Sequence, residues 1–261
     1  MNIIITGAGR GIGYETVKHF ISMEGNRIIA ISRDISALQK LANEISVGEN
    51  NSNLYPVSIN LDEKGFEKQL LSYVLDRFKK IDILINNAGV LINKSIQQLT
   101  SEDFDSMFSV NTKAPFLLVK LLLPYFNKPS HIVNISSMGG FQGSSKFSGL
   151  SLYSASKGAL TILTECMAEE LKDKDIKVNC LALGTVQTEM LDKAFPGYKA
   201  RSSPVDIGEF ITNFALNAHK QINGKIIPGV LCRQKSLSKL YRVIKRKEVL
   251  RRWANLLQTS H

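Results

Sequence analysis

The chain has 261 residues, of which 44% are hydrophobic and 21% charged, and such proportions are typical of a globular protein with a substantial core. It has a net charge of +10, no apolar run long enough to span a membrane and nothing that resembles a secretory signal, so we expect a cytoplasmic protein. The three cysteines lack metal or redox spacing, so we expect no metal centre, with Cys166 and Cys180 buried as small hydrophobic side chains.

A glycine-rich turn follows the first predicted strand. Residues 2–6 form a short apolar run, residues 7–13 read Gly-Ala-Gly-Arg-Gly-Ile-Gly, and a helix opens at Tyr14. In this context a glycine pattern predicts a dinucleotide site, because the backbone can approach a pyrophosphate and the helix start supplies amides. A turn that only packs strand on helix is the alternative. The predicted cofactor contacts in this turn are Gly7, Arg10, Gly11, Ile12 and Gly13.

The end of the second predicted strand, residues 27–31, indicates which dinucleotide is bound. An acidic residue there binds a ribose hydroxyl pair, as in NAD enzymes, whereas an arginine favours the 2′-phosphate of NADP. Ser32 takes the first position after the strand and Arg33 the next, with Arg10 nearby in the glycine turn. Because two guanidinium groups bind a dianion strongly, we predict NADP(H), with NAD less favoured. Asp34 is the residue that argues for NAD.

The rest of the chain alternates apolar strands with amphipathic helices. This alternation predicts an α/β fold in which one doubly wound parallel sheet forms a single Rossmann-type domain. Further strands are predicted at 54–61, 81–85, 131–135, 177–183 and 225–228, and helices at 66–78, from 100, from 153 and at 205–218. Two of the strand ends carry short or polar residues that suit a bound cofactor, namely Asn60, Leu61, Asn87, Ala88 and Gly89.

The predicted helix that begins near residue 100 contains Pro115. Because proline has no N–H, it cannot donate to the carbonyl group four residues back, which belongs to Asn111. A freed carbonyl in the middle of a helix is placed to hold an ordered water molecule. A simple kink of the helix over the core is the alternative.

Tyr153 and Lys157 are four residues apart and therefore share one face of a predicted helix. Such a pair occurs often by chance, but here Ser137 lies upstream at the end of a strand. A lysine ammonium ~5 Å from a tyrosine, at an effective dielectric of ~20, favours the phenolate by roughly 3 kcal/mol. We therefore predict that Lys157 lowers the pKa of Tyr153, that Tyr153 exchanges a proton with a substrate, and that Ser137 positions a carbonyl oxygen.

In this order, the motifs resemble those of the short-chain dehydrogenase/reductase family, and of a 3-oxoacyl reductase-like member, over about residues 1–230. The signatures are Thr6 to Gly13, Asn86 to Gly89, Asn111, Ser137, and Tyr153 to Lys157. The resemblance implies a catalytic set of Asn111, Ser137, Tyr153 and Lys157, with Asn111 holding a water molecule linked to Lys157. It also implies that Thr188 touches the nicotinamide amide, that Asn60 and Leu61 contact adenine, and that the protein is a homodimer or homotetramer. The cofactor set is then Gly7, Arg10, Gly11, Ile12, Gly13, Arg33, Asn60, Leu61, Asn87, Ala88, Gly89, Tyr153, Lys157 and Thr188.

Three features depart from the family pattern. Leu183-Gly184 stands where Pro-Gly is usual, which puts the first turn of the next segment in doubt. The interval between Ser137 and Tyr153 is longer than is common, so the loop between them is longer. No Asp-Gly-Gly ending follows Val230, which puts a tetramer contact through the last strand in doubt. The segment 184–204 is predicted to be an apolar lid, through Met190, Leu191, Phe195 and Tyr198.

The net charge is concentrated in a basic tail, which we assign as residues 231–261 beside a catalytic domain of residues 1–230. Between residues 233 and 261, nine Lys or Arg and one acidic residue give +8 of the total +10. Apolar residues recur among them at helical spacing, and such a helix can lie on an anionic membrane or meet an acidic partner. We favour instead a helix docked on its own domain or subunit partner, or a solvated end. No nucleic-acid-binding motif accompanies the tail, so we expect no nucleic-acid partner.

Two functions are compatible with these motifs. The first is an NADPH-dependent oxidoreductase that interconverts a carbonyl and an alcohol in a small or medium, partly apolar substrate. In it the nicotinamide supplies the hydride, and Tyr153 supplies the proton. The alternative is a non-catalytic NADP(H)-sensing binding protein of the same fold. Retention of both Tyr153 and Lys157 favours the enzyme.

Overall fold

A computed structural model describes residues 1–46 and 53–229 of the chain. Within these residues, seven strands form one sheet in the order β3-β2-β1-β4-β5-β6-β7, and every neighbouring pair is parallel. The strands are β1 (Asn2–Thr6), β2 (Arg27–Ser32), β3 (Leu54–Ser58), β4 (Ile81–Asn86), β5 (Phe126–Ser137), β6 (Ile176–Leu183) and β7 (Ile226–Pro228). The predicted α/β fold with a doubly wound parallel sheet is confirmed.

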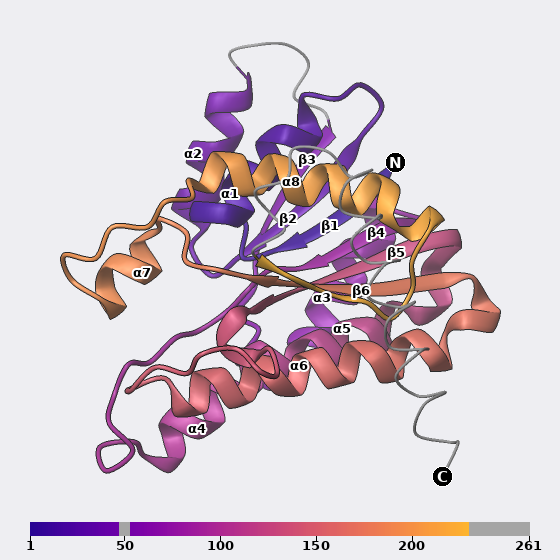
Figure 1. Ribbon diagram of the computed structural model, residues 1–261. Helices are drawn as coiled ribbons and strands as arrows, with labels where there is room; N and C mark the ends of the chain where they lie inside the picture. The colour runs from indigo at the N-terminus through magenta and orange to yellow at the C-terminus, as the bar shows by residue number, and fades with distance from the viewer. Residues whose placement is uncertain (47–52, 230–261) are drawn as a thin grey trace, which may run out of the picture.

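Helices cover both faces of the sheet, as Figure 1 shows. One face carries α1 (Gly11–Ile21), α2 (Ile35–Ser46) and α8 (Pro204–Asn217). The opposite face carries α3 (Phe66–Arg77), α5 (Ala114–Leu122) and α6 (Ser151–Glu170). Two shorter helices, α4 (Ser101–Phe108) and α7 (Glu189–Ala194), lie toward one edge of the molecule, and α7 stands apart from both layers.

The apolar run at the N-terminus explains why β1 lies in the middle of the sheet. Successive side chains of a strand point to opposite faces, so a strand covered on both faces needs apolar residues at every position. Ile3 and Ile5 pack into the core under α1 and α8, while Ile4 packs into the core on the opposite face. All three are fully buried. The central strand is therefore held by two hydrophobic cores at once.

The strand order also predicts where a ligand binds. From β1 the chain proceeds outward to β2 and β3, and then returns to the other side of β1 to form β4. Connections that leave in opposite directions open a crevice at the carboxyl ends of the strands, and open α/β sheets bind ligands there. The glycine turn after β1 and the Asn86–Gly89 turn after β4 both lie at this point.

The structure adds three local features to the sequence prediction. Helix α2 was not predicted, and α7 forms inside the segment expected to be a loop. The helix predicted from residue 100 divides into α4 and α5, joined by a π-helical turn, Ser109–Lys113. Pro115 stands at the start of α5, where a missing N–H is tolerated. The proline thus accompanies a widened turn at Asn111 and not a simple kink.

The two described cysteines differ. Cys180 on β6 is fully buried, as expected, but the expectation is wrong for Cys166, which is exposed on α6. An apolar pattern does not distinguish the buried from the solvent side of that helix, because its outer face also carries apolar residues such as Ile162. Cys232 and the basic tail, 231–261, lie outside the described residues. None of the helices in the described ranges combines the length and the apolar character needed to cross a bilayer.

Candidate active site

In the turn between β1 and α1, the backbone at the start of α1 packs closely against the backbone at the end of β1. Gly7 and Gly11 have positive φ angles of 68° and 57°, a region that side chains other than glycine rarely adopt. A Cβ atom at Gly13 would lie 2.2 Å from the carbonyl oxygen of Gly7, so only glycine fits there. Arg10 occupies the position before α1 but makes no side-chain capping bond. The first amides of α1 are therefore left for another acceptor, as a pyrophosphate site requires.

The turn after β4 is fastened to the glycine turn. The Thr6 hydroxyl accepts hydrogen bonds from the amides of Asn87 and Ala88, both at 3.0 Å. The Asn87 side chain donates in return to the carbonyl oxygens of Thr6 and Gly7, at 3.0 and 3.2 Å. These four bonds hold the two turns together as one wall. Asn87 thus serves the architecture of the wall, besides its predicted contact with the cofactor.

The segment after β2 presents cationic side chains. One oxygen of the Asp34 carboxylate accepts from the amides of Ser36 and Ala37, at 3.0 and 3.2 Å, and so caps α2. In the described part of the chain, the side chains of Arg33 and Lys40 form no hydrogen bond or ion pair, and both residues line the cleft. The Asp34 carboxylate, which argued for NAD, thus caps α2, whereas the Arg33 and Lys40 side chains are available to bind an anion.

Arg10 has a partner on the other side of the cleft. Its Nη1 atom lies 3.0 Å from Oε2 of Glu189, the first residue of α7, and both side chains are exposed. Thr188 precedes this helix and caps it, because its hydroxyl accepts from the amide of Leu191 at 3.3 Å. The Thr188 hydroxyl thus accepts one hydrogen bond as a cap and keeps its own proton to donate.

Asn60 and Leu61 lie beyond β3 on the cleft wall, as predicted. The Asn60 side chain donates to Glu63 at 3.1 Å and accepts from the amide of Asp62 at 3.3 Å, so it stabilises its own turn. Leu61 is 7% exposed and packs in the core beneath α3. Asn60 and Leu61 thus contribute a partly apolar stretch to the cleft wall, of the kind that suits an adenine ring.

Ser137, Tyr153 and Lys157 meet at the carboxyl end of β5. Ser137 is the last residue of that strand, and the other two occupy the first turns of α6. The buried Ser136 hydroxyl donates to the carbonyl oxygen of Lys157 at 2.8 Å, and the Lys157 ammonium donates to the carbonyl oxygen of Ile135 at 2.9 Å. These two bonds fix the start of α6 against the strand.

The burial of this group determines its pKa values. Burial lowers the pKa of Lys157 to about 8, with neighbouring Cys180 opposing the shift. Burial also raises the pKa of Tyr153, and a hydrogen bond with the Ser137 side chain opposes it. The predicted lowering of the Tyr153 pKa by Lys157 is therefore wrong in direction. In this structure desolvation of the phenol has the largest effect on its pKa.

Asn111 is fully buried in the π-helical turn and does not line the cleft. Its side chain accepts from the amide of Val90 and donates to the Val90 carbonyl oxygen, both at 2.8 Å. It also donates to the Ser156 hydroxyl at 2.9 Å. A Cβ atom at Gly89 would lie 3.3 Å from both the Asn111 oxygen and the Lys157 ammonium. Asn111 thus joins the wall at Gly89 to α6, close to Lys157.

One cleft of about 850 Å³ brings the predicted residues together. Gly13 and Asn111 are the predicted site residues that stand outside its lining. The lining also includes residues that the sequence analysis did not single out, namely Lys40, Leu91, Met138, Phe147, Leu150 and Val186. Phe147 and Leu150 belong to the long loop after Ser137, whose length was the one signal for them. Nothing in the sequence pointed to Lys40, because α2 was not predicted.

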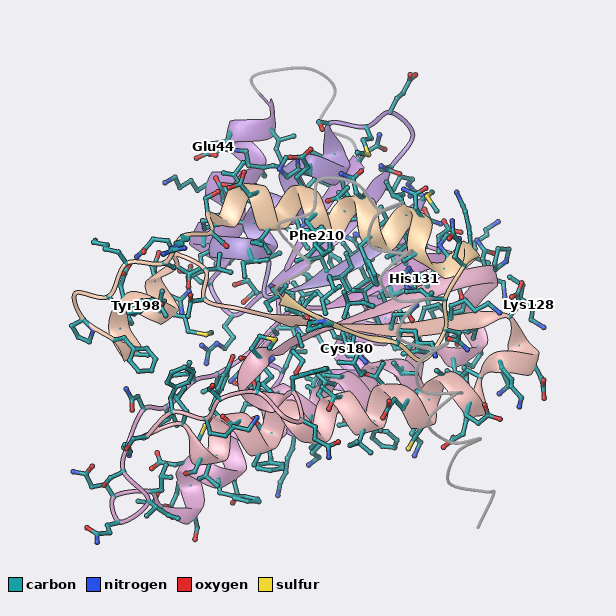
Figure 2. All side chains as sticks on the ribbon, in the orientation of Figure 1. Glu44, Lys128, His131, Cys180, Tyr198 and Phe210 are labelled. Atoms are coloured by element: carbon teal, nitrogen blue, oxygen red, sulfur yellow. The ribbon has the colours of Figure 1, made fainter. Side chains whose placement is uncertain are left out.

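The segment predicted as a lid is part of the cleft wall. Met190, Leu191, Phe195 and Tyr198 all line it. Figure 2 shows Tyr198 on the segment beside α7, at the opposite end of the molecule from Lys128. The cleft therefore has a polar half at the glycine turn and an apolar half beneath the lid. Among the described residues, no group of His, Cys, Asp or Glu side chains is arranged to hold a metal ion.

Known proteins share this sequence pattern. The profile of the short chain dehydrogenases matches residues 1–199. A 3-oxoacyl-[acyl-carrier-protein] reductase of Thermotoga maritima is 30% identical over 241 residues, which cover 86% of this chain and 94% of the relative. An uncharacterized oxidoreductase of Staphylococcus aureus is 29% identical over 222 residues, covering 84% of this chain and 92% of the relative. The chain belongs to the short-chain dehydrogenase family. As a member of it, the protein is an NAD(P)-dependent oxidoreductase.

Solved structures resemble this short-chain dehydrogenase in fold. A 3-ketoacyl-(acyl-carrier-protein) reductase from Brucella melitensis, complexed with NADH, matches with a TM-score of 0.77 and 24% identity, over 87% of this chain and 95% of that one. A short chain dehydrogenase from Shigella flexneri, complexed with NADP, matches with a TM-score of 0.79 and 24% identity, over 87% and 96%. At these identities the likeness establishes the fold. Both nicotinamide cofactors occur among these neighbours.

Proposed function

We propose that this short-chain dehydrogenase interconverts a carbonyl compound and an alcohol with NADP(H), and that Tyr153 exchanges the proton. One observation carries the proposal. Ser137, Tyr153 and Lys157 line the same cleft as the glycine turn. A dinucleotide cradle and a proton donor in one cleft are what such a reaction requires. When bound, the nicotinamide supplies or accepts the hydride.

Ser137, Tyr153 and Lys157 have different roles in the proposed proton transfer. The Tyr153 phenol donates the proton when a carbonyl is reduced. The Ser137 hydroxyl, which lines the same part of the cleft, binds the same carbonyl oxygen and orients it. With a pKa of about 8, the Lys157 ammonium is mostly charged at pH 7 and stabilises the phenolate as it forms. Asn111 acts as a positioning residue, by holding Val90 and Ser156.

The cationic end of the cleft supports NADP(H) over NAD(H). Arg33 and Lys40 line it, Arg10 lies on the glycine turn, and Asp34 is turned toward the start of α2. A 2′-phosphate adds a double negative charge at this end, and guanidinium groups bind phosphate through paired hydrogen bonds. The remaining cofactor contacts in the proposal are the glycine turn, Asn60 and Leu61, the Asn87–Gly89 turn, and Thr188 near the nicotinamide.

The apolar half of the cleft supports a small or medium, partly apolar substrate. Leu91, Phe147, Leu150 and the lid residues offer it hydrocarbon surface. We also propose that the protein is a homodimer or homotetramer. Large apolar side chains at Phe104, Phe116 and Ile162 are exposed on α4, α5 and α6, and neighbouring apolar surface of this kind favours association.

The proposal is tested by following oxidation of NADPH and NADH with a broad panel of carbonyl compounds, beside the variant Tyr153→Phe. Turnover with NADPH preferred, and lost in the variant, is the expected result. Binding of NADPH that raises the melting temperature without any turnover would favour the NADP(H)-sensing alternative. A preference for NADH would contradict the assignment of Arg33.

A further inference from the structure

The helix α7 of the lid is held at both ends by side chains that are distant from it in the sequence. At its first residue, Glu189 pairs with Arg10 of the glycine turn at 3.0 Å. At its last residue, the carbonyl oxygen of Ala194 accepts from the Asn93 side chain at 2.7 Å. These contacts join residues that are 179 and 101 positions apart in the sequence. The lid therefore has one contact with the glycine turn of the cleft, through Arg10, and one with the segment after β4, through Asn93.

The Asn93 contact is supported by neighbouring contacts between residues 93–94 and Gly149. Lys94 donates its amide to the carbonyl oxygen of Gly149 at 3.2 Å, and Gly149 has a φ of 83°. A Cβ atom at Gly149 would lie 1.9 Å from the Asn93 side-chain oxygen, so glycine is required beneath it. By contrast, the Arg10–Glu189 pair is exposed, with 53% and 62% of the two side chains accessible. The contact on the cofactor half is the weaker and more exchangeable of the two.

Three cationic residues, Arg10, Arg33 and Lys40, line the cleft that is proposed to hold the cofactor. Within the described residues, the side chains of Arg33 and Lys40 form no hydrogen bond or ion pair, whereas Arg10 is bound to Glu189. A phosphate that recruits Arg10 must compete with the Glu189 carboxylate, and it also meets that carboxylate as a like charge. A cofactor without the 2′-phosphate leaves the Arg10–Glu189 pair intact.

We propose that Glu189 couples the 2′-phosphate of the cofactor to the lid, by releasing Arg10 when a 2′-phosphorylated nucleotide binds. Glu189 is then a specificity-determining residue that weakens the binding of 2′-phosphorylated nucleotides and spares unphosphorylated ones. Because coupling is reciprocal, the phosphate that takes Arg10 from Glu189 also releases the first residue of α7 from the cofactor half of the cleft. This inference rests on the proposed use of NADP(H).

Nucleotide fragments that carry no nicotinamide test the coupling without turnover. The dissociation constants of 2′,5′-ADP and of 5′-AMP are measured by calorimetry for the wild type, Glu189→Gln and the control Glu165→Gln. Glu165 is an exposed acid on α6, so its variant has the same change in charge away from the cleft. We expect Glu189→Gln to bind 2′,5′-ADP about threefold to fivefold more tightly, as loss of an exposed ion pair allows. Its affinity for 5′-AMP and both affinities of Glu165→Gln should stay at the wild-type values.

A second measurement follows the lid itself. Lys193, Lys199 and Arg201 are exposed trypsin sites on α7 and the segment after it. Trypsin should cut this segment faster in Glu189→Gln, and faster in the wild type with 2′,5′-ADP than with 5′-AMP. In the background Arg10→Gln, the change at Glu189 should leave the rate of cleavage unaltered and should raise the affinity for 2′,5′-ADP by less than in the wild type, because only the like-charge repulsion remains.

The outcomes separate the two proposals. If the wild type prefers 2′,5′-ADP but Glu189→Gln binds it no more tightly, the coupling is refuted and the NADP(H) assignment stands. If the wild type shows no preference for 2′,5′-ADP over 5′-AMP, the NADP(H) assignment fails, and the coupling fails with it.

Discussion

Replacement of Lys157 by methionine should stabilise the fold at neutral pH while it removes the ammonium from the proposed site. Lys157 is 4% exposed, and burial depresses its pKa from 10.5 to about 8. At 1.36 kcal/mol per pKa unit, this shift means that the charged Lys157 ammonium lowers the free energy of unfolding at pH 7 by about 3 kcal/mol. Lys157→Met escapes this cost but loses the bond to the Ile135 carbonyl oxygen, worth about 1–2 kcal/mol.

The pH dependence is the sharper part of this prediction. Because the pKa of Lys157 is lower in the folded state, the unfolded state binds more protons between pH 8 and 10.5. The free energy of unfolding of the wild type should rise, relative to the variant, by about 2 kcal/mol between pH 7 and pH 10. The loss of the hydrogen bond and any change in packing are constant terms that cancel in this difference.

Urea unfolding at a series of pH values measures both quantities. Lys120→Met, at an exposed position on α5, is the matched control, and it should follow the wild type at every pH. A difference between the wild type and Lys157→Met that stays constant from pH 7 to pH 10 would refute the assignment of a depressed pKa. It would mean that the ammonium is solvated in the native state.

Two further substitutions test the surroundings of the site and of the core. Gly89→Ala places a methyl group 3.3 Å from the Lys157 ammonium and the Asn111 oxygen, so kcat should fall roughly tenfold with little change in melting temperature. Gly184→Ala meets no atom within 4 Å and is the control; equal losses in both variants would contradict the crowding argument. His131 is fully buried and neutral, because burial lowers its pKa to about 3. The unfolded state therefore binds a proton at this residue below pH 6.5 and the folded state does not, so the stability that His131 contributes above pH 6.5 is lost as the pH falls toward 3. Between pH 7 and pH 5 the wild type should lose about 2 kcal/mol relative to His131→Gln, measured by urea unfolding, and parallel curves would show that His131 is not held neutral.

The strands and the main glycine positions could be predicted from the sequence because their causes are local. Ile3, Ile4 and Ile5 form a run that only a strand covered on both faces accommodates. The turn at residues 7–13 needs glycine through its own φ angles and through the close approach of Gly13 to Gly7. Such requirements are present in the order of the residues, so the fold and its switch point were accessible before the structure.

The pairing of polar groups could not be predicted in the same way. Asp34 argued for NAD until its carboxylate was found to cap α2, a helix that the sequence analysis did not include. The partner of Arg10 lies 179 residues away, at the start of a six-residue helix with no strong pattern of its own. The direction of the Tyr153 pKa depended on burial, which a Tyr and Lys four residues apart do not reveal. These properties arise from the tertiary structure.

The most direct test of the proposed chemistry is turnover by the wild type and by Tyr153→Phe, with NADPH and NADH, on one panel of carbonyl compounds. The variant keeps the ring and removes only the hydroxyl, so its affinity for NADPH should stay within about twofold of wild type. We predict turnover by the wild type, faster with NADPH, and a loss of at least about a hundredfold in the variant, as expected when a positioned proton donor is removed. Undiminished turnover by Tyr153→Phe would contradict the assignment of the proton donor on which the proposed mechanism depends.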